Sequence, residues 1–212
     1  MVDSEFVLSR FGFIAAYWRL FFQIEPNLQN GRFSLPIFRL PTEIRLEAEL
    51  LFIDGERQIP KQTFYQYING WKPSEVFIFQ SACDALAYFQ LRKMANSDVV
   101  FLIVGRIPDS EIIDYIKSSF SYAKISLGFP KDLLATISAI KVAGKLRDET
   151  IALRLDDDTV FCSYRNREVV ISVAEFSLSK VSKLTGFWPK MKTLTPPHGH
   201  NSFFDFLKNS SR

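Results

Sequence analysis

Ser74-Glu-Val-Phe-Ile-Phe-Gln-Ser-Ala-Cys-Asp-Ala-Leu-Ala-Tyr-Phe-Gln90 is the stretch that decides the fold. Its apolar run, residues 76–79, is long enough for one buried strand and stops at Gln80. Apolar residues then recur at the i, i+3, i+4, i+7 spacing of a helix, at Ala82, Ala85, Leu86 and Phe89. A strand that enters a helix almost without a loop places the turn at its carboxyl end, where open α/β sheets form their sites. We therefore expect a candidate site beside Gln80 and Ser81.

The same alternation of strand and helix continues along the chain. Apolar runs at 98–104 and 123–127 predict two more buried strands, and Asp109 is a natural N-cap for the helix between them. A third helix is expected to follow residue 130 and to fade near Gly144. Alternating strands and helices of this length predict a parallel sheet with right-handed crossovers, so the fold class is α/β.

The flanking segments follow other patterns. Residues 4–23 predict a helix that Gly12 divides, and residues 33–40 and 44–53 predict strands, the second closed by a turn at 54–55. Further segments with their own patterns are a small antiparallel meander at about 150–172, a short helix at 173–184 and a final helical turn at 203–208. We divide the chain into a helix plus β-rich extension, residues 1–72, and an α/β core with the meander and a C-terminal tail, residues 73–212.

Composition narrows the class of protein more than its function. Of the 212 residues, 47% are hydrophobic and 23% charged, as in an ordinary globular protein with a sizeable core, and a net charge of +3 is weak support for an anionic partner. Cys83 and Cys162 are far apart, so we expect buried, reduced thiols and a cytoplasmic protein. The acidic N-terminus is unlike a signal peptide, and the apolar run at 11–22 is too short to span a bilayer, so no membrane association is expected.

A resemblance to a known family adds to this picture. Residues 79–88 resemble the first motif of the Toprim (topoisomerase–primase) domain, in particular that of Toprim-like proteins associated with bacterial mobilisation and primase genes, whose pattern is a strand followed by Glu-Ser-x-x-Asp-Ala-Leu. Residues 99–105 are similar to the second Toprim strand, 125–132 to the third with its Asp-x-Asp motif, and 201–208 to the closing Lys-Asp-x-Asn-Asp-x-Leu-Lys. The resemblance implies a Toprim-like parallel sheet flanked by helices. It covers residues 74–147 well and the tail weakly.

The chain departs from this family at the residues that carry its chemistry. The resemblance implies a glutamate general acid or base and carboxylates that hold Mg²⁺, a hard ion that prefers oxygen ligands. Gln80 stands at the glutamate position and cannot ionise, and Pro130 stands at the first aspartate of Asp-x-Asp, next to the cation Lys131. The other remnant positions are Asp84, Asp132 and Asp205. We therefore predict no catalytic residues, no bound metal and no other cofactor; Mg²⁺ would be expected only if the site were active despite these changes.

Three of the remnant positions also have a structural interpretation. Ser81 and Asp84 have the spacing of a capping-box variant, in which both side chains would bind helix N-terminal amides, and we favour that role. Asp132 suits the first turn of a helix because its charge complements the helix dipole, and Pro130 suits the first helical position. Two other sets of polar residues could bind metal, but Asp156–Asp158 more closely matches a solvated turn, and His198 with His200 matches a tail loop.

The strongest candidates for binding are basic residues near the C-terminal end. Lysines at positions 180, 183, 190 and 192 surround Phe187 and Trp188. Basic side chains could contact phosphates while the aromatic rings stack on bases. The nucleic-acid-binding candidates are Lys180, Lys183, Trp188, Lys190 and Lys192. The alternative interpretation is a solvated helix face beside a tryptophan of the core.

Three functional hypotheses remain. The first is a catalytically degenerate Toprim-like protein that binds DNA or RNA without cutting it, in a context such as replication or mobile-element transfer. The second is an interaction or scaffold module whose partners are other proteins. The third is a divergent Mg²⁺-dependent nuclease or primase-type enzyme that uses Asp84, Asp132 and Asp205. The sequence indicates no particular oligomeric state.

Overall fold

A five-stranded mixed sheet forms the centre of the molecule. The computed structural model describes residues 3–36 and 47–210. The strand order is β12-β8-β6-β7-β5, in which β5 is antiparallel to β7 and the other pairs are parallel. The strands are β5 (Tyr65–Asn69), β6 (Glu75–Phe79), β7 (Val99–Ile103), β8 (Lys124–Gly128) and β12 (Lys192–Thr193). The expected α/β class with a parallel core is therefore confirmed, and β5 adds an antiparallel edge strand.

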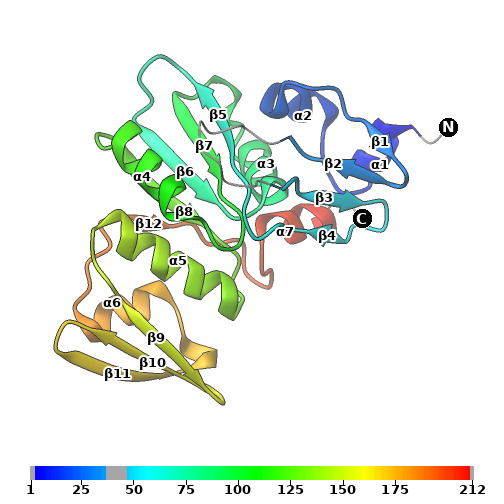
Figure 1. The fold of residues 1–212 in the computed structure, drawn as a ribbon. Helices are drawn as coiled ribbons and strands as arrows, with labels where there is room; N and C mark the ends of the chain where they lie inside the picture. Colours follow the sequence, from blue (N-terminus) through cyan, green and yellow to red (C-terminus); the bar gives the residue numbers. More distant parts are fainter. Residues whose placement is uncertain (1–2, 37–46, 211–212) are drawn as a thin grey trace.

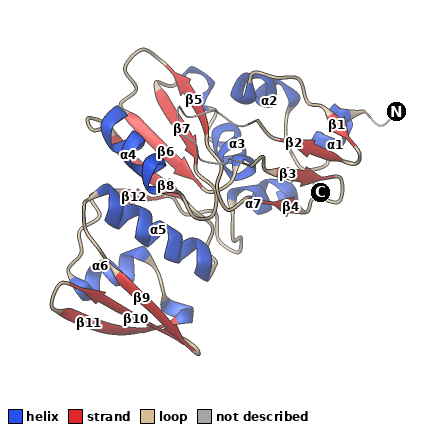
Figure 2. Cartoon of the chain, viewed as in Figure 1, coloured by secondary structure: helices blue, strands red, loops and turns tan. Residues whose placement is uncertain are grey.

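The two faces of this sheet bury different side chains. Because successive residues of a strand point to opposite faces, β6 presents Phe77 and Phe79 on one face and Val76 and Ile78 on the other. The aromatic face packs against α3 (Ala82–Leu91), and the aliphatic face packs against α4 (Ser110–Ser119) and α5 (Leu133–Leu146), as Figures 1 and 2 show. The sheet is thus covered on both sides, which explains why its central strands are nearly continuous apolar runs.

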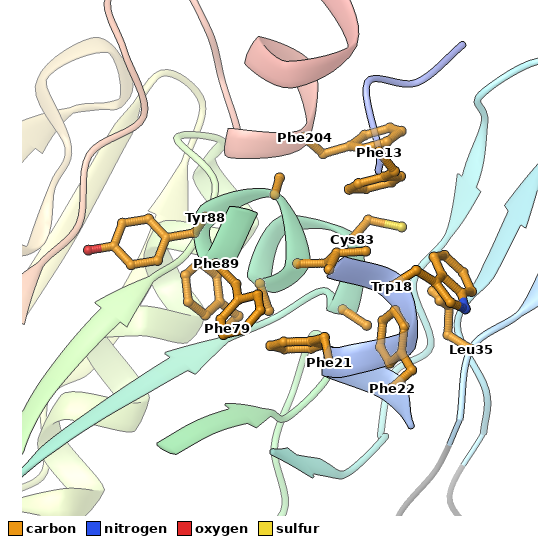
Figure 3. Packing of buried hydrophobic residues seen from close by; sticks show 14 of the residues in the cluster. Phe13, Trp18, Phe21, Phe22, Leu35, Phe79, Cys83, Tyr88, Phe89 and Phe204 are labelled. Atoms are coloured by element: carbon orange, nitrogen blue, oxygen red, sulfur yellow. The ribbon is translucent and has the colours of Figure 1, made fainter. Parts of the chain in front are cut away.

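The aromatic face carries an unusually dense cluster of rings. Helix α2 (Ala15–Phe22) lies over α3 and brings Trp18, Phe21 and Phe22 into this cluster (Figure 3). The C-terminal helix α7 (Phe203–Ser210) brings Phe204, whose ring stacks on Phe13 with centroids 5.5 Å apart. The high phenylalanine content therefore serves largely to pack this half of the core.

The N-terminal part forms a small antiparallel sheet beside this cluster. Its order is β1-β2-β3-β4, with β1 at Leu28–Gln29, β2 at Arg32–Ser34, β3 at Leu50–Phe52 and β4 at Arg57–Gln58. The expected long helix is divided at Gly12 into α1 (Ser4–Ser9) and α2, and the expected turn at 54–55 joins β3 to β4. The strands expected at 33–40 and 44–53 are shorter where they are described, and residues 37–46 lie outside the described residues.

The expected meander is present at the other end of the molecule. Strands β9 (Ala152–Asp156), β10 (Thr159–Tyr164) and β11 (Arg167–Ser172) pair antiparallel. Helix α6 (Leu178–Thr185) packs on them and is preceded by a separate 3₁₀ turn at Val173–Glu175, so the single helix expected at 173–184 is wrong in its first five residues. Another 3₁₀ turn, Met94–Asn96, follows α3.

Within residues 3–36 and 47–210, no helix combines the length and the apolarity that a bilayer span requires.

Candidate nucleic-acid interface

The turn after β6, where the sequence predicts a site, is filled by the protein's own backbone and side chains. Gln80 is only 5% exposed, and its side-chain amide nitrogen donates a hydrogen bond to the Arg106 carbonyl oxygen at 3.2 Å. The Ser138 hydroxyl donates to the same carbonyl at 2.6 Å. The next strand end, at Gly105, lies against the backbone of residues 60–63 from the N-terminal extension. Gln80 is therefore a buried packing residue whose amide is engaged by the backbone.

Asp84 lies in a buried cluster that ties three parts of the chain together. The Arg57 guanidinium donates to one carboxylate oxygen of Asp84 at 2.9 Å, and the backbone N–H of Phe204 donates to the other at 2.9 Å. Arg57 also lies over the Phe204 ring, 4.7 Å from its centroid. The capping-box expectation is half correct: Ser81 caps α3 by accepting from the Asp84 N–H at 3.3 Å, but the Asp84 carboxylate binds Arg57 and α7 instead.

A second carboxylate, which sequence reasoning missed, completes this cluster. Glu49 accepts hydrogen bonds from the Ser81 hydroxyl at 2.7 Å and from the Ala82 N–H at 2.6 Å, so it occupies the N-terminus of α3. Burial raises the pKa of Glu49, although the positive charge of Arg57 and these two hydrogen bonds oppose that rise. Glu49 directly precedes β3 and Arg57 is the first residue of β4. Both lie more than twenty residues before α3, so no local pattern could have revealed them.

The other remnant positions end or begin helices. Asp132 is the N-cap of α5, just before its first turn, and accepts from the Ala135 N–H at 2.8 Å. Pro130 precedes this cap, so its expected place at the first helical position is wrong. Asp205 lies in the first turn of α7. Lys131, which adjoins Pro130, donates a hydrogen bond from its ammonium group to the Pro196 carbonyl at 3.3 Å. In the part of the chain that the structure describes, no three His, Cys, Asp or Glu side chains are grouped as metal ligands.

The remaining metal candidates and the cysteines are accounted for by structure. Asp157 and Asp158 form the exposed turn between β9 and β10, as expected. The His200 ring packs against Phe206, with centroids 5.2 Å apart. Cys83 and Cys162 are both buried free thiols, as expected.

The basic candidates, in contrast, largely come together. Lys183, Trp188, Lys190 and Lys192 line one open groove of about 1240 Å³, formed by α6, the loop 186–191, β12 and the first residues of β6 and β8. Trp188 is 73% exposed. Lys180 is the exception: it does not line this groove, and its ammonium pairs with Glu175 at 3.3 Å.

The local sequence explains how this tryptophan is presented. Helix α6 ends at Gly186, whose φ of 80° forms a left-handed cap that turns the chain away from the helix. Phe187 is then buried against Tyr164, with ring centroids 5.4 Å apart, and anchors the loop. The next residue, Trp188, points outward. Of the two aromatics expected to contact bases, Phe187 is therefore a core residue, and the alternative of a core tryptophan is wrong for Trp188.

Two further charged residues, which the sequence did not single out, also line the groove. Lys124 is the first residue of β8 and Glu75 the first residue of β6, and they are paired across the two strands. With Lys183, Lys190 and Lys192, Lys124 gives four lysines against one carboxylate. The groove therefore lies at the amino ends of the parallel strands, opposite the Gln80 corner.

Comparison with known proteins adds no assignment, since no family model matches the chain and no curated protein matches it.

Proposed function

We propose that this chain is a non-catalytic nucleic-acid-binding protein that holds its ligand in the groove between α6 and the amino ends of β6 and β8. The observation that carries the proposal is the meeting of four lysines around one exposed tryptophan. Lys124 comes from a strand start about sixty residues before the others. Lysine side chains that line one groove suit a phosphate backbone, and an exposed indole suits base stacking.

The absence of catalysis in this proposal follows from the Gln80 corner. Gln80 cannot take up or release a proton, and its amide is bonded to a backbone carbonyl. Both oxygens of Asp84 are engaged by Arg57 and Phe204, so this carboxylate is not free to hold Mg²⁺. The likeness of residues 79–88 to a Toprim motif supports a role in DNA replication or mobile-element transfer.

Binding of a labelled oligonucleotide at several salt concentrations tests this function. For single strands the slope of log K against log salt is about −0.7 per neutralised phosphate, so four lysines predict a slope of about −3. Replacing Lys190 and Lys192 together by Gln should weaken binding and make the slope shallower by about 1.4. Lys180→Gln is the matched control, because Lys180 lies on α6 outside the groove, and it should leave both quantities unchanged.

A protein-scaffold role is the competing interpretation, and the same titration separates the two. If neither single-stranded nor double-stranded oligonucleotides bind at low salt, the nucleic-acid proposal is wrong and the scaffold role gains support.

A further inference from the structure

Two more exposed aromatic residues lie at the same end of the sheet as the groove. Trp71, in the loop between β5 and β6, has a relative exposure of 101%, and Tyr122, just before β8, has 55%. The Lys72 ammonium lies over the Tyr122 ring, 5.9 Å from its centroid. Exposed aromatic rings beside a cation offer faces on which a planar ligand can stack.

The loop that carries Trp71 is held in place by specific contacts. The Asn69 side-chain amide donates to the carbonyls of Ala95 and Ser97, both at 2.9 Å, and so fixes the base of the loop. Gly70 has a φ of 94°, a left-handed conformation that turns the chain just before Trp71. The outward placement of the indole is therefore set by the loop's own construction.

Trp71, Lys72 and Tyr122 form an aromatic rim, and this rim is continuous with the groove. The Lys124 N–H donates to the Ser74 carbonyl at 2.9 Å, which joins the loop after Trp71 to the segment that carries Tyr122. Lys124 itself lines the groove and lies two residues after Tyr122. The path from Trp188 to Trp71 thus runs along the amino ends of β8 and β6.

The rim and the groove supply different chemistry. The groove carries four lysines against Glu75. The region around Trp71 and Tyr122 holds one lysine, Lys72, over the Tyr122 ring, and one carboxylate, Asp98, beside Gly70. The groove therefore suits phosphates, and the rim mainly suits the faces of bases. In a duplex these faces are stacked on one another and closed to a side chain, but in a single strand they are open.

We propose that the ligand is a single-stranded nucleic acid whose backbone lies in the groove and whose bases continue over Lys124 to stack on Tyr122 and Trp71. This inference rests on the nucleic-acid binding proposed above and extends it by a strand type and a second contact region. DNA and RNA share the chemistry used here, namely phosphates and unstacked bases.

Tryptophan fluorescence separates the two contact regions. The chain has three tryptophans, and Trp18 is buried, so Trp188→Phe leaves Trp71 as the exposed reporter and Trp71→Phe leaves Trp188. Phenylalanine keeps a ring for stacking in each case. An oligonucleotide of about 16 residues should quench both reporters, whereas one of about 4 should quench Trp188 alone. Duplex of the longer length should leave Trp71 unquenched.

A second readout distinguishes stacking from charge. Trp71→Ala should weaken binding of the longer strand about fivefold or more, as expected for one lost stacked base, without changing the salt slope. Titration with oligo-dT and oligo-U shows which of the two sugars is accepted.

The two reporters distinguish failure of this inference from failure of the proposed groove. Quenching of Trp188 with no response of Trp71 to the long strand overturns this inference and leaves the proposed groove intact. If neither reporter responds and no oligonucleotide binds, both proposals are wrong.

Discussion

Replacing Arg57 by Met should destabilise the protein strongly, because Arg57 is the only described cation that is bonded to Asp84 in this buried cluster. Methionine preserves the unbranched aliphatic stem of arginine but lacks the guanidinium. Asp84, which is 1% exposed, would then keep only its hydrogen bond from the Phe204 N–H, with Glu49 buried nearby.

The structure sets the size of the effect. Removing one partner of a buried ion pair costs about 3–5 kcal/mol. The Arg57 side chain is 14% exposed, so some solvent screening reaches the pair and the lower end, about 3 kcal/mol, applies. For a protein of this size that loss corresponds to a fall in Tm of about 6–12 °C.

Urea denaturation of the wild type and Arg57→Met measures this difference. Arg19→Met is the matched control, since Arg19 pairs with Glu5 and Glu25 at the surface and its loss should change stability little. Arg57 also lowers the pKa of Glu49, so its removal raises that pKa and the difference should shrink as the pH falls. A loss below about 1 kcal/mol at neutral pH would refute the assignment of Arg57 as a buried counter-ion.

Three other substitutions test the filled corner and the cluster. Gly128→Ala should destabilise by about 1–3 kcal/mol in thermal melts, because its Cβ would lie 2.2 Å from the Phe79 ring; an unchanged Tm would contradict this packing. Gln80→Glu should cost about 1–3 kcal/mol and create no Mg²⁺-dependent nuclease activity, since a carboxylate would replace the amide donor to the Arg106 carbonyl; metal-dependent cleavage would show that the corner is accessible. Burial raises the pKa of Glu49 in the folded protein above its ordinary value of 4.5. The protonated side chain therefore contributes its full stability to the fold below pH 4.5, and this contribution is lost as the pH rises through the folded pKa. Glu49→Gln cannot titrate, and the stability of the wild type relative to this variant should therefore fall with rising pH in urea titrations; a flat or rising difference would contradict the sign.

The sequence pattern was sufficient for the centre of the fold because its signals there are local. The strand before Gln80 and the helix after it both show a clear pattern of apolar residues. Asp109 marks the start of a helix through its side-chain carboxylate, and Gly186 marks the end of one through its left-handed backbone. Strands β4 and β12 have two residues each, too few for any period to show. Their pairing depends on neighbours far away in the chain.

The candidate site was predicted only in part, for the same reason. The run from Lys183 to Lys192 is contiguous enough to be recognised as a basic and aromatic segment. Lys124 and Trp71 join it through contacts between strand starts that are distant in sequence, and Lys180 leaves it because α6 turns that side chain toward Glu175. The Toprim-like motif drew attention to the carboxyl end of the sheet, whereas the open groove lies at the amino end.

Photo-crosslinking most directly tests whether nucleic acid binds in the groove at the amino ends of β6 and β8. A single-stranded oligonucleotide that carries iodouridine would be irradiated with the full-length protein, and the attached residues identified by mass spectrometry. The proposed groove predicts crosslinks at Trp188, lost in Trp188→Ala but retained in Lys180→Gln. Crosslinks confined to the segments around Gln80, with none at Trp188, would contradict the account.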